Sequence, residues 1–228
     1  MQLEQAVHIS AGVEQKILPP LTLDAQFYLI HRYGLAVFSD VVRFVDGEAK
    51  PLNYTNQGIG YSYGAEIMLK HEVTRNFYGW LAYTLSRSVQ RPKPDGDFVR
   101  FVFDQTHILT MVASYRVGAG IEAGIRFRLV SGRPETPVLG GFFDSDGDFY
   151  RQIFGEERSE NRQLFHQLDA RVEKTWLFRL WRLSLYLDVQ NVYNAKNPEA
   201  TLYDYRYRES APLRGLPIVP SLGIRGSF

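Results

Sequence analysis

The sequence predicts an all-β protein, an antiparallel up-and-down β-barrel that crosses a membrane. Apolar and polar residues alternate in nine segments, and each segment is about 9–12 residues long, close to the length that crosses a bilayer at a tilt. Strands of globular proteins average only about 5–6 residues. Short and long connections also alternate between the segments.

The clearest alternation lies in residues 181–190, WRLSLYLDVQ. Side chains of a strand point alternately to opposite faces, so a period of two produces one apolar and one polar face. Trp181 and Leu183 begin the apolar set. Asn191 and Asn194 follow the segment, and asparagine favours turns. We therefore expect the strand to end there and a loop to begin.

The same alternation recurs in eight further segments, which are residues 7–14, 21–29, 59–70, 77–86, 106–116, 121–129, 164–173 and 221–228. In a membrane barrel the apolar set faces lipid and the alternate set faces the lumen. This predicts a set of lumen-facing charged residues, namely Glu66, Arg126, Arg128, Asp169, Arg171, Glu173 and Asp188.

The connections indicate which end of the barrel faces outward. Four are tight, near residues 18–20, 74–76, 118–120 and 177–179, and four are long and polar, over residues 38–57, 88–104, 131–162 and 192–216. Outer-membrane barrels have short periplasmic turns and long extracellular loops. The last strand then ends in the periplasm at Phe228. Because nine is odd and MQLEQAVHIS lacks the features of a signal peptide, we expect the chain to be incomplete at its N-terminal end.

Composition narrows the class of protein. The chain has 228 residues, with 26 Lys and Arg against 25 Asp and Glu, so it has no basic field for nucleic acid. Cysteine is absent, which excludes disulfides and thiolate metal sites. The 14 Tyr and 15 Phe are typical of a protein whose aromatic rings line membrane interfaces. Mean hydropathy is −0.23, and no apolar run is long enough for a transmembrane helix.

The chain resembles the C-terminal part of the barrel of a TonB-dependent outer-membrane receptor in five stretches: YGAEIMLKHEVTRNFYGWLAYTLSRS (63–88), FDQTHIL (103–109), QLDARVEKTW (167–176), LYLDVQNVYN (185–194) and GLPIVPSLGIRGSF (215–228). The resemblance covers nearly the whole chain. It implies a Gram-negative outer-membrane barrel of about 22 strands filled by a plug. Residues 1–228 would be the last nine strands, without the plug. Gly64 and Glu66 would face inward, where a plug packs closely.

The resemblance also implies a function and partners. The longer protein would take up a scarce nutrient, such as a ferric siderophore, a cobalamin or an oligosaccharide, and would need no permanently bound cofactor. Its partners would be outer-membrane lipid, the missing N-terminal strands and plug, the TonB complex acting through the plug, and the barrel-assembly machinery. Leu222, Ile224 and Phe228 resemble the C-terminal signal that this machinery recognises.

Aromatic and cationic residues gather in two of the long connections, at Tyr150, Tyr203, Tyr205, Arg206, Tyr207 and Arg208. Cation–π and charge-assisted contacts from such residues suit an anionic or aromatic ligand. The same residues equally suit contact with lipopolysaccharide phosphates. The non-specific interpretation is the preferred one, and ligand capture is the alternative.

Three aspartates, Asp144, Asp146 and Asp148, have the spacing of a calcium loop. The EF-hand pattern requires Gly and Glu at positions that Phe149 and Gly155 occupy here. A solvated acidic loop is the preferred interpretation, and calcium is the alternative.

Two His–Asp combinations were considered as acid–base pairs, His107 with Asp104 and His166 with Asp169. Both histidines belong to the outward-facing set near loop ends, which favours a place at the membrane interface. The sequence contains no GxSxG, HExxH or Walker motif. We therefore expect that the protein is not an enzyme.

Two other architectures compete with the receptor. A small autonomous barrel acting as a porin, adhesin or enzyme would have an even number of strands and a signal peptide. A soluble sandwich or lectin would bury Trp181, Leu183 and Leu185 between two sheets.

Overall fold

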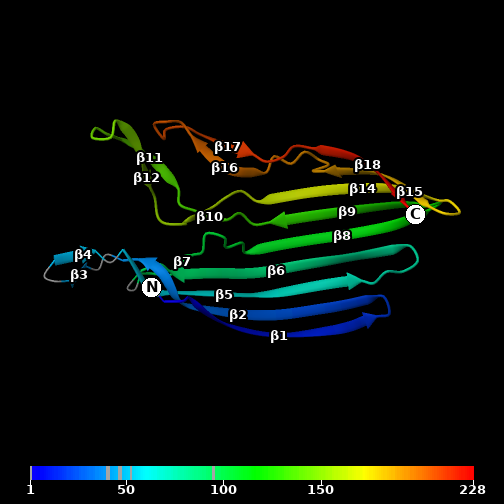
Figure 1. The fold of residues 1–228 in the computed structure, drawn as a ribbon, viewed down its shortest axis with the longest axis horizontal. Helices are drawn as coiled ribbons and strands as arrows, with labels where there is room; N and C mark the ends of the chain where they lie inside the picture. The colour runs from blue at the N-terminus through cyan, green and yellow to red at the C-terminus, as the bar shows by residue number, and fades with distance from the viewer. Residues whose placement is uncertain (1, 40–41, 46–47, 52, 94–95) are drawn as a thin grey trace.

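The computed structural model describes residues 2–39, 42–45, 48–51, 53–93 and 96–228, and contains no helix in them. Nine long strands form one antiparallel sheet in which each strand pairs with the next long strand along the chain (Figure 1). They are β1 (Gln5–Leu18), β2 (Leu21–Phe38), β5 (Tyr54–His71), β6 (Phe77–Arg91), β8 (His107–Gly118), β9 (Ile121–Val130), β14 (Phe165–Leu177), β15 (Arg182–Gln190) and β18 (Val219–Ser227). The nine predicted strands and their up-and-down order are confirmed.

Five strands are longer than the 9–12 residues that the alternation predicted. The strands β2 and β5 have 18 residues each, β6 has 15, β1 has 14 and β14 has 13. The alternation marks only the part of a strand that has one apolar face. In β2, β5 and β6 backbone pairing continues past this part toward the long connections, where apolar and polar residues no longer alternate strictly, so the pattern stops before the strand does.

The long connections contain ordered structure of their own. Short hairpins pair β3 (Val42–Val45) with β4 (Glu48–Pro51), β11 (Val138–Asp144) with β12 (Phe149–Phe154) and β16 (Pro198–Tyr203) with β17 (Ser210–Arg214). Two-residue strands add β7 (Val99–Arg100) on β6 and pair β10 (Pro134–Glu135) with β13 (Glu160–Asn161). These hairpins lie at one end of the sheet, while the tight turns and the C-terminus lie at the other (Figure 1).

The tight turns have local causes in the sequence. Gly118, Ala119 and Gly120 all have positive φ angles, of 113°, 51° and 75°. Glycine adopts this region without a steric cost, which allows β8 to reverse directly into β9. The turn before β6 is closed by Thr74, whose backbone N–H and Oγ1 both donate to the Phe77 carbonyl, at 2.9 and 3.0 Å.

The sheet has one apolar face and no apolar core. Among the described residues, no apolar side chain is buried. Register places on one face, called the apolar face here, the side chains of Phe27, Ile67, Leu81, Leu109, Phe127, Val172, Leu187 and Leu222. Trp181 and Leu185 on this face are 37% and 40% exposed. The burial that a soluble sandwich requires at these positions is therefore absent.

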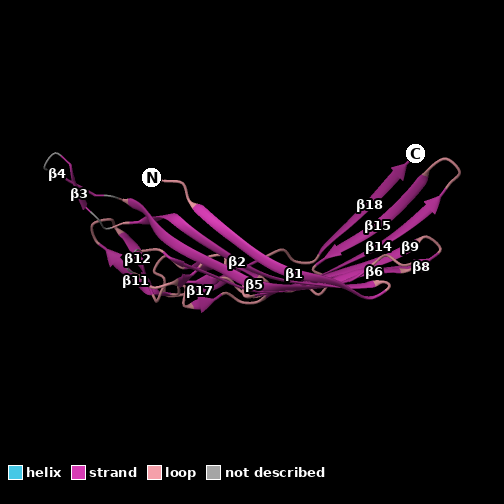
Figure 2. Ribbon diagram, turned by 90° about the horizontal axis from the view of Figure 1, so that it is seen from below, coloured by secondary structure: helices cyan, strands magenta, loops and turns pink. Residues whose placement is uncertain are grey.

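The opposite face, called the polar face here, carries the charged side chains of Glu66, Arg126, Asp169 and Arg171, while Arg87 and Lys174 stand on the apolar face. The sheet is curved (Figure 2), and in the described part of the chain its edge strands β1 and β18 each pair on one side only. It is therefore an open wall. No helix within the described ranges is long and apolar enough to cross a membrane.

Candidate functional site on the polar face and the loop hairpins

The charged residues predicted to face the lumen lie together on the polar face. Arg126 donates to Asp169 through Nε and Nη2 at 2.9 and 2.6 Å, and Gln167 donates to the same carboxylate at 2.6 Å. Arg171 pairs with Glu173 at 2.7 Å and lies 3.6 Å from Asp188. Charges on neighbouring strands thus neutralise one another in a ladder across β9, β14 and β15.

Two predicted lumen-facing residues stand outside this ladder. The Arg128 guanidinium lies 5.2 Å from the centre of the Phe165 ring, and in the described part of the chain it forms no ion pair. Glu66 is exposed on β5 and likewise has no ion-pair partner among the described residues. Both charges remain available to a group that approaches the polar face.

The structure gives a reason for Gly64 that sequence reasoning did not find. A Cβ at Gly64 would lie 2.5 Å from the Leu85 carbonyl oxygen and 2.8 Å from the Tyr28 hydroxyl. The Tyr28 side chain, one strand away on the polar face, therefore lies over the glycine. Within this chain the close approach to Gly64 is made by Tyr28, and the packing of a plug beside it stays a prediction.

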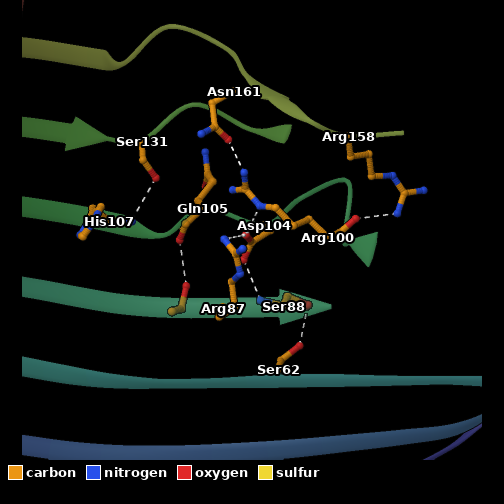
Figure 3. Close-up of polar contacts among 11 residues, drawn as sticks. Ser62, Arg87, Ser88, Arg100, Asp104, Gln105, His107, Ser131, Arg158 and Asn161 are labelled. Carbon is orange, nitrogen blue, oxygen red and sulfur yellow. Dashed lines mark hydrogen bonds and ion pairs between the residues drawn. The ribbon is translucent and has the colours of Figure 1, made fainter. Parts of the chain in front are cut away.

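A buried carboxylate, Asp104, organises the segment between β6 and β8 (Figure 3). It accepts hydrogen bonds from the Ser88 backbone N–H at 2.7 Å and from Arg100 Nε at 3.0 Å, and it lies 3.5 Å from Arg87. Arg100 also bonds Asn161, and Arg158 donates to the Arg100 carbonyl at 2.6 Å. The end of β6 and the segment before β8 are thus joined to residues 158–161, more than fifty residues further along the chain, which the sequence alone did not indicate.

Neither His–Asp combination forms a pair. His107 Nδ1 lies 2.8 Å from the Tyr83 hydroxyl, whereas Asp104 is held by Arg100 and Ser88. His166 Nδ1 lies 2.8 Å from the Tyr193 hydroxyl, whereas Asp169 is held by Arg126. The structure therefore offers no His–Asp dyad at either place.

Three of the candidate ligand-binding residues line a cleft between the hairpins. Tyr150 from β12 meets Tyr205 edge to face, with ring centres 5.7 Å apart. The cleft has a volume of about 590 Å³ and is lined by Phe143, Asp148, Phe149, Tyr150, Tyr205 and Tyr207. Five aromatic rings and one carboxylate thus surround a space of the size that small ligands occupy.

The other candidates lie beside this cleft. Arg206 donates through Nε to the Tyr205 hydroxyl at 2.5 Å, and its guanidinium lies 5.0 Å from that ring. The ring centres of Tyr203 and Tyr207 lie 6.1 Å apart. The Arg208 backbone N–H donates to Asp204, and backbone hydrogen bonds, chiefly from Glu209, lower the pKa of the Asp204 carboxyl.

The two hairpins approach each other at Gly141 of β11. A Cβ there would lie 2.6 Å from the Arg206 carbonyl oxygen and 2.9 Å from the Tyr207 ring. Only a residue without a side chain permits this contact, which brings Tyr150 and Tyr205 together. The sequence contained no signal for it, because the two segments are separated by more than sixty residues.

The three aspartates considered for calcium do not converge. Asp144 accepts hydrogen bonds from the Asp146 and Gly147 backbone N–H groups and from Arg151. The Arg151 hydrogen bond is the main cause that lowers the pKa of the Asp144 carboxyl. Within the described ranges, no group of three or more His, Asp or Glu side chains is placed to hold a metal ion. The Asp144 carboxylate instead stabilises the turn of the β11–β12 hairpin.

The turn after β15 is built as the sequence predicted. Asn191 and Asn194 both adopt positive φ angles, of 54° and 53°. Asn191 is buried, and its side-chain amide accepts from the Ala195 N–H at 2.7 Å and donates to the Ala195 and Leu216 carbonyls at 3.0 Å. A second buried amide, Asn197, bonds both backbone groups of His166 and was not singled out from sequence.

The C-terminal residues Leu222 and Ile224 lie on the apolar face and are 74% and 71% exposed. Phe228 is fully exposed, with its ring centre 6.0 Å from that of Trp181. The edge strand therefore presents an uncovered apolar row that ends in an aromatic residue.

Comparison with known proteins gives a consistent result for the fold. No protein-family model and no curated protein sequence matches the chain. Solved structures do match. The ferric-catecholate import receptor Fiu from Escherichia coli K12, in its closed form, superposes with a TM-score of 0.63 at 16% identity, covering 98% of this chain and 27% of the receptor. The chain has the fold of a TonB-dependent receptor barrel.

Two further solved structures with this receptor fold also match the chain. The FpvAI–pyocin S2 complex matches with a TM-score of 0.62, and the ferripyoverdine receptor of the Pseudomonas aeruginosa outer membrane, bound to ferripyoverdine, matches with 0.61. Each is 14% identical, with coverage of 98% of this chain and 27% of the other. The chain thus spans about a quarter of the length of these receptors. The resemblance to the receptor barrel is confirmed as regards the fold.

Proposed function

We propose that residues 1–228 form the C-terminal part of the barrel of an outer-membrane receptor, which takes up a scarce nutrient with energy supplied through TonB. A ferric chelate of the siderophore type is the nutrient class we favour. The polar face would line the lumen beside a plug carried by the rest of the protein, and the apolar face would contact lipid.

The uncovered apolar face is the observation that carries this proposal. Apolar surface is unfavourable in water by roughly 25 cal/mol per Å². A sheet of nine strands that buries none of its described apolar side chains needs a second layer, and lipid is the layer that an up-and-down wall of this kind receives.

The dimensions of the apolar face support a bilayer. Aromatic and imidazole rings stand on this face at His166 and Trp176, near the two ends of β14, and at Tyr61 and His71, in the middle and at the end of β5. Ten residues separate the two rings in each strand. With a rise of ~3.4 Å and a tilt of ~45°, they span about 24 Å across the membrane, close to the apolar band of outer-membrane barrels.

The ligand class is supported by the cleft between the hairpins. Tyr150, Tyr205 and Tyr207 present ring faces and hydroxyls, and Arg206 adds a cation at the edge. Such a surface suits a ligand with aromatic rings and anionic oxygens. Two of the structures with this fold are named as receptors of ferric chelates, which agrees with this chemistry.

The test is uptake of iron by cells that produce the full-length protein containing this segment. Radiolabelled iron supplied as a ferric catecholate should accumulate, and the double variant Tyr150→Ala, Tyr205→Ala should reduce accumulation at least tenfold while the protein stays in the outer membrane. Tyr115→Ala, an exposed tyrosine at the opposite end of the sheet, is the matched control. Uptake that is unchanged in the double variant would exclude the cleft as the ligand site.

A further inference from the structure

A hollow opens among the exposed side chains of the apolar face. Phe27, Ala65 and Leu85 are direct neighbours across β2, β5 and β6. Phe27 and Leu85 are 66% and 43% exposed, so they stand on either side of the short alanine. The hollow measures about 520 Å³, within the range of small-molecule sites.

The hollow is apolar except at the end nearer the loops. There it is lined by Tyr63, which is 49% exposed, and by its cross-strand neighbour Arg87, whose side chain is 40% exposed. Arg87 lies 3.5 Å from Asp104, but that carboxylate already accepts a shorter bond from Arg100. Two guanidinium groups share one carboxylate, which leaves a net positive charge at the mouth of an apolar space.

A second cation stands on the same face further toward the loops. Arg91 is four residues beyond Arg87, a distance of about 13 Å along β6. Its guanidinium lies 5.7 Å from the Phe98 ring, and its buried Nε has no hydrogen-bond partner among the described residues. Phe98 in turn contacts Tyr61, so the cation is held within a row of rings at the edge of the apolar band.

We infer that this place binds one membrane lipid with an anionic phosphate headgroup. An acyl chain fills the hollow over Ala65, and the phosphate accepts hydrogen bonds from Arg87 and from the Tyr63 hydroxyl. Arg91 adds to the positive potential that attracts the headgroup. Arginine matches phosphate geometry well, and an apolar groove beneath a cation suits an acyl chain beneath a phosphate. The inference rests on the proposed function, because it needs the apolar face to contact lipid.

The test uses the full-length protein in detergent, titrated with phosphatidic acid or with phosphatidylcholine of the same acyl chains and followed by native mass spectrometry. Phosphatidic acid should bind at least tenfold more tightly. Arg87→Gln should remove most of this preference, and Arg87→Lys should retain part of it. Lys174→Gln, which removes a cation near the other end of the same face, should leave the preference unchanged.

A second variant tests the hollow itself. Ala65→Leu fills the space over the alanine and should weaken phosphatidic acid binding about tenfold, while Ala123→Leu, elsewhere on the apolar face, should not. Equal affinity for the two lipids, or equal loss in Arg87→Gln and Lys174→Gln, would overturn the inference. Failure of the unaltered protein to insert into phosphatidylcholine vesicles would instead overturn the proposed function, so the two failures are distinguishable.

Discussion

The small size of two glycines in this sheet is explained by side chains on adjacent strands. Tyr28 lies over Gly64, and Tyr186 lies so close to Gly223 that a Cβ there would be 2.2 Å from its ring. An aromatic ring packed on a cross-strand glycine shields backbone that would otherwise be bare. Each of these glycines therefore belongs to a pair with a cross-strand tyrosine, and at Gly64 the Leu85 carbonyl is a second close neighbour.

Gly64→Ala should destabilise the protein by about 1–3 kcal/mol, because the new methyl group meets the Leu85 carbonyl and the Tyr28 ring. The measurement is urea-induced unfolding of the protein in lipid vesicles. Gly226→Ala is the matched control, since a Cβ at Gly226 meets nothing within 4 Å. Equal stability of the two variants would contradict the close packing of Tyr28.

Asp169→Ala should cost about 1–3 kcal/mol in the same unfolding measurement. The change leaves the Asn191 N–H and the Arg126 guanidinium without their acceptor in a partly buried place. Asp188→Ala should cost less, because Asp188 makes only a 3.6 Å contact with Arg171. A larger effect at Asp188 would show that the ladder is organised around Arg171 instead.

At the scale of the elements, hairpins in the long connections create the cleft. The β11–β12 hairpin is closed by Asp144, and the β16–β17 hairpin is closed by Asp204, whose carboxylate accepts the Arg208 and Glu209 backbone N–H groups. Gly141 then lets the first hairpin contact the second. The position of the aromatic rings thus depends on two local turns and one close contact.

The order of the β11–β12 hairpin should depend on pH. The pKa of Asp144 is lowered in the folded protein, so its stabilising effect is fully present above the ordinary aspartate pKa of about 3.9 and is lost as the pH falls through the lower folded value. Asp144→Asn mimics the protonated state at neutral pH. It should increase hydrogen exchange of residues 138–154, whereas Asp146→Asn should not.

At the scale of the whole molecule, a single curved wall separates two environments. Its apolar face is exposed along nine strands, and its polar face carries a self-neutralising ladder of charges. Because no second layer of this chain covers either face within the described ranges, the stability of the wall depends on what surrounds it. Lipid on one side and a hydrated lumen on the other satisfy both faces.

Substitutions at two neighbouring residues of β6 test whether the apolar face contacts lipid and the polar face lines the lumen. Leu81→Arg places a charge on the apolar face, opposite Leu69 and between the midplane and the His71 edge of the apolar band, and should cost about 1–2 kcal/mol in lipid vesicles, with a loss of inserted protein. Ala82→Arg points to the polar face and should be tolerated. If both substitutions were tolerated equally, the assignment of the two faces to lipid and lumen would be wrong.

Much of the fold was predictable because its signal is local. Alternation reflects the two environments of a strand, and it is visible wherever one environment is apolar. The nine strands, their order and the turn at Asn191 were all predictable for this reason. The hairpins were missed because their strands have only four to seven residues, and several, such as β11 with the sequence VLGGFFD, have apolar residues at consecutive positions, so no period of two is visible.

The sequence by itself determined that this chain is a wall of antiparallel strands with one apolar face, since that property depends only on neighbours along the chain. Tertiary structure alone decided which distant residues meet, such as Asp104 with Ser88, Gly141 with Arg206, and Phe27 with Ala65 and Leu85. Contacts of this kind depend on strand register and on the paths of the connections. These follow from the free energy of the whole sheet, and no single stretch of sequence records them.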